Sequence, residues 1–425
     1  MKMGLLVLLA LLIAGSGTQL TSNSSTQAQA TADTYVVEWN EVAMRAFTAS
    51  GLSPAEAFPA LAQVGIAVYD SVVAVRGTYE PFAVHAQALP GTSAEAAVVS
   101  AAYRALSRVF PWQDASILAP AYLASMATIP EGSSKEKGIA LGRDVADELF
   151  RERSRYGFQP SLTDPTPSTP GIGVWVPTAP VPPIGPTLGR VQPFGMESVR
   201  DLIPNGPPAL SGAEWAAEFN EVKAIGARNS TTRTPEQTLA ARFWAEAPIQ
   251  QAELSYRKFM RDRELDVVEA ARLMAMLSVT RANAAIACWQ AKYLYDFWRP
   301  VTAIPAGDSD GNAETVGDPS WLPLLPVTPN HPEYPSAHSC VTPATARVIA
   351  SFLGSENISL TMPSLTGLGD RYYPTMQSLI TEVGEARIWG GIHFRSAIED
   401  GTRIGMRTAD YVLCRYFRPL TAPSC

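Results

Sequence analysis

The sequence predicts an all-α fold made of helix bundles, in which a long, proline-rich, irregular connection joins two helical halves. Apolar residues recur three and four positions apart over long stretches of both halves, as amphipathic helices require, and period-two strand patterns are scarce. The chain has 425 residues, of which 46% are hydrophobic, so it can bury a large core. We therefore expect two groups of packed helices and no major sheet.

The first 30 residues have the features of a signal peptide. Lys2 supplies a positive charge, the run from Leu5 to Ile13 is apolar, and Ala28-Gln29-Ala30 offers small residues for cleavage. We expect cleavage of residues 1–30 and export, which gives a secreted or periplasmic protein. The alternative is an uncleaved signal anchor.

Residues 31–158 form the predicted N-terminal helical region. Ser53-Pro54-Ala55-Glu56 marks one helix start, because serine can cap a helix and proline fits its first turn. The predicted helices lie within residues 36–76, 92–109 and 117–156.

The composition changes after residue 158. Residues 159–211 are rich in Pro, Gly and Thr and lack a helical period, which predicts an irregular connection over the surface. Residues 212–425 form the predicted C-terminal helical domain. Its helices are expected at residues 212–227, 234–262, 264–297, 336–354, 374–388 and 396–416.

The charge balance excludes some classes of partner. The chain has 33 basic and 40 acidic side chains, a net charge of −7 and an isoelectric point near 5.3, the wrong sign for a surface that gathers nucleic acid or anionic lipid. No run after the signal peptide approaches the roughly 18 consecutive apolar residues of a membrane helix, so we expect no membrane contact after cleavage. A cationic site in this acidic protein must be built locally.

Four cysteines, Cys288, Cys340, Cys414 and Cys425, can form disulfides in an exported protein. Four cysteines allow three pairings, and their spacing does not choose between bridges and buried thiols. The spacing also matches no zinc-binding pattern.

Three short segments of the second half carry cations, a hydroxyl and imidazoles in one ordered series. In the first segment, Lys292 and Arg299 lie seven residues apart, so both project from one helix face if the helix extends to Pro300. Arginine offers a planar fork, and lysine a point charge, to the oxygens of an oxyanion. The alternative is an ordinary solvated helix face.

The second segment, Pro335-Ser336-Ala337-His338, precedes a predicted helix. The Ser336 hydroxyl and the free N–H groups of the helix start can bind an anion, and the small Ala337 lets that backbone come close. His338 stands where a general acid or base would reach the anion. The alternative is that Ser336 only caps the helix.

In the third segment, Arg387 and His393 flank the pair Gly390-Gly391, which permits a bend that carries both side chains to one place. His393 can serve as a ligand of a metal-centred oxyanion or as a nucleophile that takes a phosphoryl group. The alternative is a satisfied core histidine. Together the three segments suit a tetrahedral oxyanion, phosphate or vanadate.

This ordered pattern resembles the signature shared by vanadium-dependent haloperoxidases and the type 2 phosphatidic acid phosphatase superfamily: Lys, six residues, Arg-Pro; then Pro-Ser-x-His; then Arg, five residues, His. The run from Trp289 to Pro300 is similar to the site helix of soluble chloroperoxidase-type haloperoxidases well beyond the minimal motif. The Gly-Ile-His-Phe-Arg stretch at residues 391–395 also resembles theirs.

The resemblance implies vanadate as the cofactor, with phosphate able to occupy the same site. His393 would be the axial ligand, and His338 the acid–base partner for hydrogen peroxide. The groups that hold the equatorial oxygens would be Lys292, Arg299, Ser336, the Ala337 N–H and Arg387. The reaction would oxidise a halide with hydrogen peroxide to hypohalous acid, which then reaches a small organic acceptor, while vanadium acts as a Lewis acid.

Three flanking residues take roles by the same resemblance. Trp289 matches a tryptophan of the chloroperoxidase halide pocket, whereas His331 lies where chloroperoxidases carry Phe and bromide-oxidising relatives carry His. This pair favours bromide over chloride, with a solvent-facing loop position as the alternative for His331. Glu246 would be a carboxylate that orients Arg387.

The sequence departs from the family pattern at two positions. Ala337 replaces the usual Gly, and Ala397 replaces the Asp expected four residues after His393. In the phosphatases that Asp orients the nucleophilic histidine, and Glu399 or Asp400 could substitute for it from the next turn. The loss disfavours a phosphohistidine mechanism.

Three hypotheses follow from the sequence. The chain is an exported vanadium haloperoxidase, a soluble acid phosphatase that uses His393 as nucleophile and His338 as general acid, or a catalytically silent helical protein that binds phosphate. The extended match from Trp289 to Pro300 and the presence of Ala397 favour the first.

Overall fold

The computed structural model describes residues 32–154 and 169–421, and the regular elements in these ranges are helices apart from one two-stranded sheet. The all-α prediction is therefore confirmed. The predicted signal peptide, residues 1–30, lies outside the described residues.

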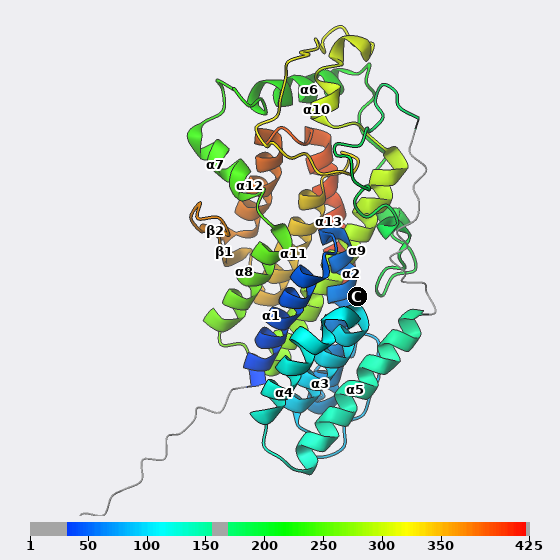
Figure 1. Ribbon diagram of the computed structural model, residues 1–425, viewed down its shortest axis with the longest axis vertical. Helices are drawn as coiled ribbons and strands as arrows, with labels where there is room; N and C mark the ends of the chain where they lie inside the picture. The colour runs from blue at the N-terminus through cyan, green and yellow to red at the C-terminus, as the bar shows by residue number, and fades with distance from the viewer. Residues whose placement is uncertain (1–31, 155–168, 422–425) are drawn as a thin grey trace, which may run out of the picture.

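Figure 1 shows an elongated molecule, with the N-terminal helices at one end and most of the C-terminal helices at the other. The first half contains α1 (Ala32–Ser50), α2 (Pro54–Arg76), α3 (Ala94–Val109), α4 (Ala119–Ala127) and α5 (Ser133–Ser154). The second half contains α6 (Ala213–Ile225), α7 (Pro235–Phe243), α8 (Pro248–Asp262), α9 (Val267–Tyr295), α10 (Pro300–Ala303), α11 (Ala337–Leu353), α12 (Met376–Trp389) and α13 (Arg395–Arg415). Between the halves, residues 169–212 are irregular except for two short 3₁₀ turns.

Local signals define several helix starts. The Ser53 N–H donates to Glu56 Oε2 at 2.8 Å, which closes the first turn of α2. Asp266 caps α9 by accepting from the N–H groups of Val268 and Glu269. One predicted boundary is wrong: the helix expected over residues 234–262 is divided into α7 and α8, because Pro248 lacks an N–H and begins a new helix.

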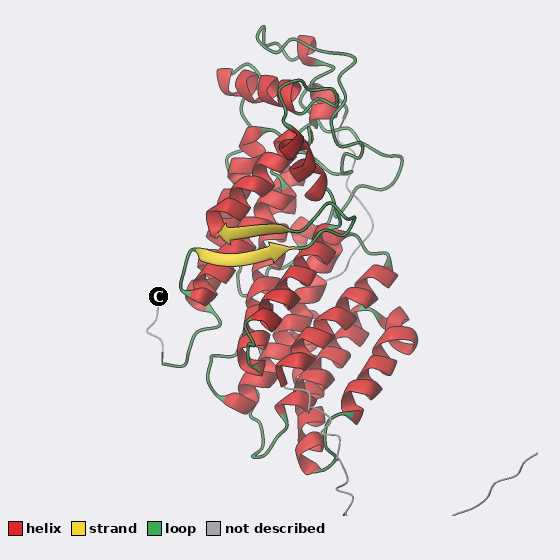
Figure 2. Ribbon diagram, turned by 90° about the vertical axis from the view of Figure 1, so that its left-hand side faces the viewer, coloured by secondary structure: helices red, strands yellow, loops and turns green. Residues whose placement is uncertain are grey.

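The sheet is the other departure from the prediction. Strands β1 (Asn357–Met362) and β2 (Arg371–Thr375) pair antiparallel, with Leu360 opposite Tyr373. Figure 2 shows this hairpin lying across neighbouring helices. Burial alternates along β1, but a period-two pattern this short does not stand out from the surrounding helical pattern.

Helix α9 connects the two halves. It is buried on nearly all sides, as expected for a helix that is apolar around its whole circumference. It packs against α1 and α2 of the first half and against α11 and α13 of the second. A Cβ at Gly65 of α2 would collide with the Ser278 side chain, so these two helices approach closely. One hydrophobic cluster runs from Tyr35 in α1 to Phe417 after α13.

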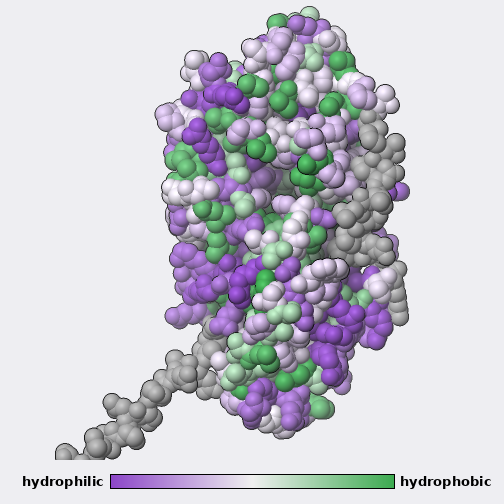
Figure 3. All heavy atoms as spheres, viewed as in Figure 1, coloured by the Kyte–Doolittle hydropathy of each residue, from purple (hydrophilic) through white to green (hydrophobic). Residues whose placement is uncertain are grey.

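Helix α2 is the one helix, in the described part of the chain, that is long and apolar enough to cross a membrane. However, 83% of its most apolar window is buried inside the protein, as for the core helix of a bundle. The sequence criterion of roughly 18 consecutive apolar residues did not identify α2 as a candidate. Figure 3 shows hydrophilic and hydrophobic side chains interspersed on the face viewed there.

The cysteines divide into two groups. Cys288 and Cys340 are free and buried, so the pairing of these two cysteines with each other does not form. Cys414 is disulfide-bonded, and Cys425 lies outside the described residues.

Candidate oxyanion-binding site

The three sequence segments meet beyond the C-terminal end of α9. Lys292 lies in the last turn of α9, Arg299 directly precedes α10, and Ser336 directly precedes α11. Arg387 lies in the last turn of α12, and His393 leads into α13. No more than 2% of any of these five residues is exposed. The fold therefore buries a cluster of polar groups that is costly unless they bind something.

Lys292 and Arg299 reach this place differently from the prediction. Helix α9 ends at Tyr295, because Asp296 adopts a left-handed conformation with φ of 46°. Arg299 is therefore not on the face of α9, and its extended backbone, with ψ of 154°, begins α10 instead. The two side chains still converge, because both bind the loop that precedes α11.

Backbone carbonyl groups of this loop surround Lys292. Its Nζ donates to the carbonyl oxygens of Pro332 and Glu333 at 3.0 Å each, and also to that of Pro335. These bonds fix the ammonium group but supply no opposite charge. The charge of Lys292 therefore remains available to an anion.

Arg299 binds the same loop and the turn before α13. Its Nε donates to the His331 carbonyl at 3.0 Å, and its Nη1 donates to the Ile392 carbonyl at 2.9 Å. Nη1 also lies 3.2 Å from Nε2 of His393. Arg299 thus joins the first and third sequence segments at one point.

Four polar atoms at the site are buried without a hydrogen-bond partner among the described residues: Glu333 Oε2, Ser336 Oγ, His338 Nε2 and Arg387 Nε. Ser336 has the extended backbone of an N-cap, but its hydroxyl makes no capping bond, so the capping alternative is wrong for this side chain. Each buried group without a partner costs about 1–3 kcal/mol. Such atoms, clustered on or beside the second and third sequence segments, indicate a site for a ligand rather than a packing defect.

The electrostatics also favour an anion. Within residues 32–154 and 169–421, none of Lys292, Arg299 and Arg387 forms an ion pair with a carboxylate. Burial is the largest cause that lowers the pKa of Lys292 to about 8, of Arg299 to about 10 and of Arg387 to about 9. A bound anion would offset this desolvation.

The histidines of the site are neutral at pH 7. Burial lowers the pKa of His331, His338 and His393 well below the ordinary value, and the neighbouring cations lower it further. A neutral imidazole keeps one nitrogen lone pair, so each ring can accept a proton or act as a ligand.

His393 is oriented by Glu333, a residue that the sequence analysis missed. Its Nδ1 lies 2.7 Å from Glu333 Oε1, and this oxygen also accepts the N–H of Phe394 at 3.0 Å. A neutral His393 therefore carries its proton on Nδ1, which leaves the lone pair of Nε2 facing the cations. Glu333 is fully buried, and desolvation raises its pKa to about 7.

This contact overturns one expectation. Neither Glu399 nor Asp400 takes the place of the carboxylate missing at Ala397. Glu399 is exposed, and Asp400 accepts a hydrogen bond from Tyr334. The carboxylate comes instead from a residue 60 positions before His393. The available signal was Glu333 itself, an acidic residue three positions before Ser336.

The bend predicted at Gly390-Gly391 is present. Gly391 has φ of 73°, and a Cβ there would collide with the carbonyl oxygen of Gly226. The chain can therefore turn between α12 and α13 in a space too small for another residue.

His331 and Trp289 lie together in the wall of the site. Their ring centroids are 5.4 Å apart, and Arg299 Nη2 lies 3.0 Å from Nδ1 of His331. Only 5% of His331 is exposed, so the solvent-facing alternative for this residue is wrong.

Glu246 does not orient Arg387 as expected. Its carboxylate accepts hydrogen bonds from Ser364 Oγ, the Leu365 N–H and Thr366 Oγ1. Among the described residues Arg387 instead donates to the Ala241 carbonyl, at 3.4 Å. Glu246 thus fixes the loop after β1. It lines the chamber but does not contact Arg387 by a hydrogen bond.

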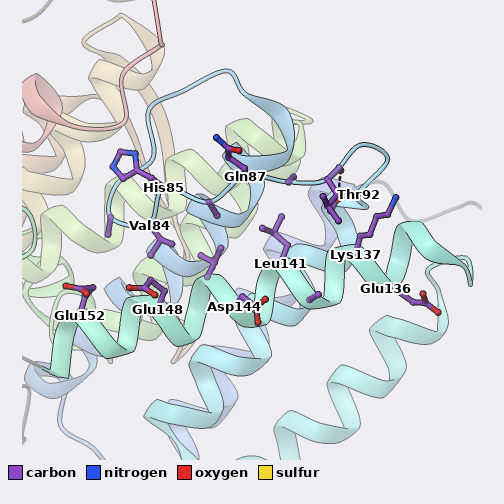
Figure 4. Close-up of a pocket in the computed structure, with 16 residues that line it drawn as sticks. Val84, His85, Gln87, Thr92, Glu136, Lys137, Leu141, Asp144, Glu148 and Glu152 are labelled. Atoms are coloured by element: carbon purple, nitrogen blue, oxygen red, sulfur yellow. Dashed lines mark hydrogen bonds between the residues drawn. The ribbon is translucent and has the colours of Figure 1, made fainter.

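A chamber of about 520 Å³ opens onto these groups. Its lining includes Trp289, His331, His338, Arg387 and His393. A larger hollow, of about 900 Å³, lies elsewhere, between α5 and residues 83–92 (Figure 4). Its carboxylates, Glu136, Asp144, Glu148 and Glu152, would repel an oxyanion, so it does not compete as the anion site.

Comparison with known proteins agrees with this description. Residues 272–421 match the family model of the VCPO second helical-bundle domain, which includes all three segments of the site. Over 281 residues the chain is 26% identical to vanadium chloroperoxidase of Curvularia inaequalis, an alignment that covers 54% of this chain and 45% of that protein. The match therefore spans somewhat less than half the length of this curated relative.

Solved structures show the same fold over most of the chain. A structure described as the first bacterial vanadium-dependent iodoperoxidase superposes with a TM-score of 0.77 at 24% identity, covering 92% of this chain and 98% of that one. A holo-type bacterial vanadium-dependent chloroperoxidase gives a TM-score of 0.65 at 18% identity, covering 85% and 92%. The chain therefore has the helical fold of these solved structures.

Proposed function

We propose that this protein is an exported vanadium-dependent haloperoxidase that oxidises halide with hydrogen peroxide. One observation carries the proposal: the site combines three buried cations that lack an ion-pair partner in the described chain with atoms of Ser336 and His338 that lack hydrogen-bond partners. A tetrahedral oxyanion would supply both the missing negative charge and the missing hydrogen-bond partners.

The donor set fits vanadate. His393 would be its ligand through Nε2, since Glu333 holds the proton on Nδ1. The oxygens would be held by Lys292, Arg299, Ser336, the Ala337 N–H and Arg387. When bound, vanadate supplies a Lewis-acid centre that activates peroxide without a change of its own oxidation state.

The other groups have roles in binding and proton transfer. The cations are fixed by backbone carbonyls before any ligand arrives, so they stabilise developing oxyanion charge with little reorganisation. The partnerless Nε2 of neutral His338 is placed to take a proton from hydrogen peroxide. A hydrogen bond with the Trp244 backbone orients this ring.

We further propose bromide as the preferred halide. The support is the buried pair Trp289 and His331 in the lining of the chamber, with His331 bound to Arg299. The relatives named above are chloroperoxidases and an iodoperoxidase, so the fold alone does not set the halide.

Acid phosphatase activity is the second candidate, and one contact favours it. The argument from Ala397 was that His393 lacks an orienting carboxylate, but Glu333 supplies one. A His393 held in this way can also attack a phosphoryl group, with His338 as the general acid. The same anion site would hold phosphate.

One paired assay separates the two activities. Purified protein is tested with and without orthovanadate for peroxide-dependent bromination of a phenol dye and for hydrolysis of an aryl phosphate. The haloperoxidase predicts that vanadate switches on bromination and suppresses any hydrolysis. Hydrolysis alone, with no activation by vanadate, would show that the main proposal is wrong.

Export is proposed from the signal-like residues 1–30 and from the disulfide at Cys414, because disulfides persist in oxidising compartments. N-terminal sequencing of protein recovered outside the cytoplasm of an expressing cell should find a chain that begins near Thr31. A mature chain that begins at Met1 would contradict cleavage.

A further inference from the structure

The C-terminal end of α7 contacts two groups of the anion site. The Trp244 carbonyl accepts a hydrogen bond from the ring of His338, and the Ala241 carbonyl accepts one from Arg387 Nη2 at 3.4 Å. Because Nε2 of His338 has no partner in the described chain, the bond to Trp244 uses Nδ1. Carbonyl groups at the end of a helix lack partners within the helix, so they can serve side chains of other elements in this way.

A buried carboxylate holds the side chain of the same tryptophan. Trp244 is 3% exposed, and its Nε1 donates to Glu382 Oε1 at 3.0 Å. Glu382 lies on α12, five residues before Arg387. A hydrogen bond to a charged acceptor is stronger than one to a neutral acceptor. Glu382 therefore fixes where Trp244 lies, and with it the carbonyl that faces His338.

The β1–β2 hairpin in turn holds Glu382. Arg371 of β2 donates to it from Nε at 2.6 Å and from Nη2 at 2.7 Å, and the Tyr373 hydroxyl donates to Oε1. Arg371 also pairs with Glu236 of α7, and Figure 1 shows α7 and the hairpin next to α12. Burial raises the pKa of Glu382, but the hydrogen bonds from Arg371, Tyr373 and Trp244 together hold it below its ordinary value. The carboxylate is therefore ionised at pH 7.

Burial of an indole does not by itself explain such an acceptor. Among the described residues, other buried indole N–H groups have no hydrogen-bond partner: those of Trp39, Trp175 and Trp298. The tryptophan whose carbonyl binds His338 differs from these in having an ionised carboxylate on its ring.

We propose that Glu382 is a positioning residue for the reaction: through the indole of Trp244 it fixes the carbonyl that holds the Nδ1–H of His338, and so keeps Nε2 ready to take a proton. This inference rests on the proposed haloperoxidase function, in which His338 is the acid–base partner. Neither Glu382 nor Trp244 lines the chamber, so both act on the reaction through His338.

The physical effect concerns the tautomer of the imidazole. A neutral ring carries its proton on one nitrogen, and the acceptor that faces Nδ1 decides which nitrogen that is. If the Trp244 carbonyl moves, the proton of His338 can shift to Nε2, which then has no lone pair for the proton of peroxide. A misplacement of about 1 Å can cost about 10²-fold in rate even when the changed residue is distant from the chemistry.

The first test needs no cofactor. Nitrogen NMR of isotope-labelled histidines in vanadate-free protein reports which ring nitrogen carries the proton. The chain has four histidines, so the His338 signals are those that disappear in His338→Ala. We expect wild type to hold the Nδ1–H tautomer and Glu382→Ala to mix the two tautomers.

Glu385→Ala is the matched control. Glu385 lies three residues further along α12, forms an ion pair with Arg395, and is 28% exposed against 21% for Glu382. It makes no printed bond to Trp244, so its removal should leave the tautomer of His338 unchanged.

The second test compares kcat with cofactor binding. Glu382→Ala should lower kcat for bromination by at least about tenfold, within the about 10²-fold that a small misplacement can cost. The dissociation constant of vanadate, measured by calorimetry, should change much less, because other segments hold His393, Lys292 and Arg299. Glu385→Ala should change neither quantity.

Two further variants separate positioning from stability. Glu382→Gln keeps an oxygen for the indole N–H but loses the ion pair with Arg371, so its Tm should fall while the tautomer and kcat stay near those of wild type. Trp244→Phe removes the indole N–H and leaves that ion pair intact, yet it should reproduce the mixed tautomers and the low kcat. It serves also if Glu382→Ala does not fold.

The outcomes separate this inference from the proposed function. A pure Nδ1–H tautomer in Trp244→Phe, or a loss of kcat that follows Tm and is as large in Glu382→Gln as in Glu382→Ala, would overturn the positioning role. The expected tautomer changes, in a protein that shows no vanadate-dependent bromination, would support the link from Glu382 to His338 and refute the haloperoxidase.

Discussion

Raising the pH should weaken oxyanion binding in steps set by two buried cations. Burial lowers the pKa of Lys292 from 10.5 to about 8 and that of Arg387 from 12.5 to about 9. A bound anion favours the protonated form of each group, so binding takes up a proton wherever the anion-free group has lost it. Sulfate is the suitable probe, because it stays a dianion throughout this range of pH.

The magnitude follows from the shift of Lys292. The difference between 10.5 and about 8 is about 2.5 pKa units, and at about 1.36 kcal/mol per unit it corresponds to about 3 kcal/mol. If sulfate restores the ordinary pKa, its dissociation constant rises about tenfold for each pH unit above about 8. Above about pH 9 the dissociation constant of sulfate should rise more steeply, because Arg387 then also loses its proton.

The same shift has an opposite effect on the anion-free protein. Because the pKa of Lys292 is lower in the folded than in the unfolded chain, the unfolded chain binds more protons between pH about 8 and 10.5. The contribution of Lys292 to the free energy of unfolding therefore increases as the pH rises through this window. The increase in Tm caused by sulfate should shrink over the same window.

Calorimetric titration with sulfate at successive pH values checks this prediction. Lys292→Met should bind sulfate weakly and lose the first step in the pH profile. Lys258→Met removes an exposed lysine that pairs with Asp262 on α8, and it should leave the profile unchanged. A wild-type dissociation constant that stays level across the predicted window would refute the assignment of Lys292 to the anion site.

Three further predictions concern single side chains. Glu333→Ala should weaken vanadate binding, measured by calorimetry, by about 10–100-fold because His393 loses the acceptor that orients it, whereas Glu399→Ala, which removes an exposed carboxylate, should bind normally. His338→Ala should lower kcat for bromination by about 10²–10⁴-fold with vanadate binding intact, and an unchanged kcat would show that His338 is not the acid–base group. His331→Phe should raise the ratio of kcat/KM for chloride to that for bromide; an unaltered ratio would remove His331 from halide selection.

Much of the helical framework could be predicted because its signals are local. The start of α9 depends on Asp266 and its neighbours, and the turn before α13 depends on the left-handed preference of Gly391. The ordered motif also predicted which side chains meet, because Lys292, Ser336 and His393 lie at element ends that the fold brings together. Such features are encoded within a few residues of where they act.

Other features depend on contacts between distant segments, which no local pattern encodes. The bond between Glu333 and His393 joins residues 60 apart, and a missing carboxylate near His393 gave no indication of where its replacement would come from. Arg299 was expected on a continuous helix, but the left-handed Asp296 ends α9 first, and the loop carbonyls then guide the guanidinium group to the site. Glu246 was expected by analogy to orient Arg387, but its carboxylate oxygens accept hydrogen bonds from the β1–β2 loop instead.

The close packing of α9 against α2 bears on how this protein can be shortened, recombined or mutated. A fragment that begins at the proline-rich connection would keep every anion-binding residue, yet it would expose the flank of α9 that Gly65 approaches and would lose the Phe58 wall of the chamber. A screen for inactive variants should therefore return substitutions in α2, far from the motif in sequence. The first half of the chain is therefore needed to cover α9 and to complete the wall of the chamber in the second half.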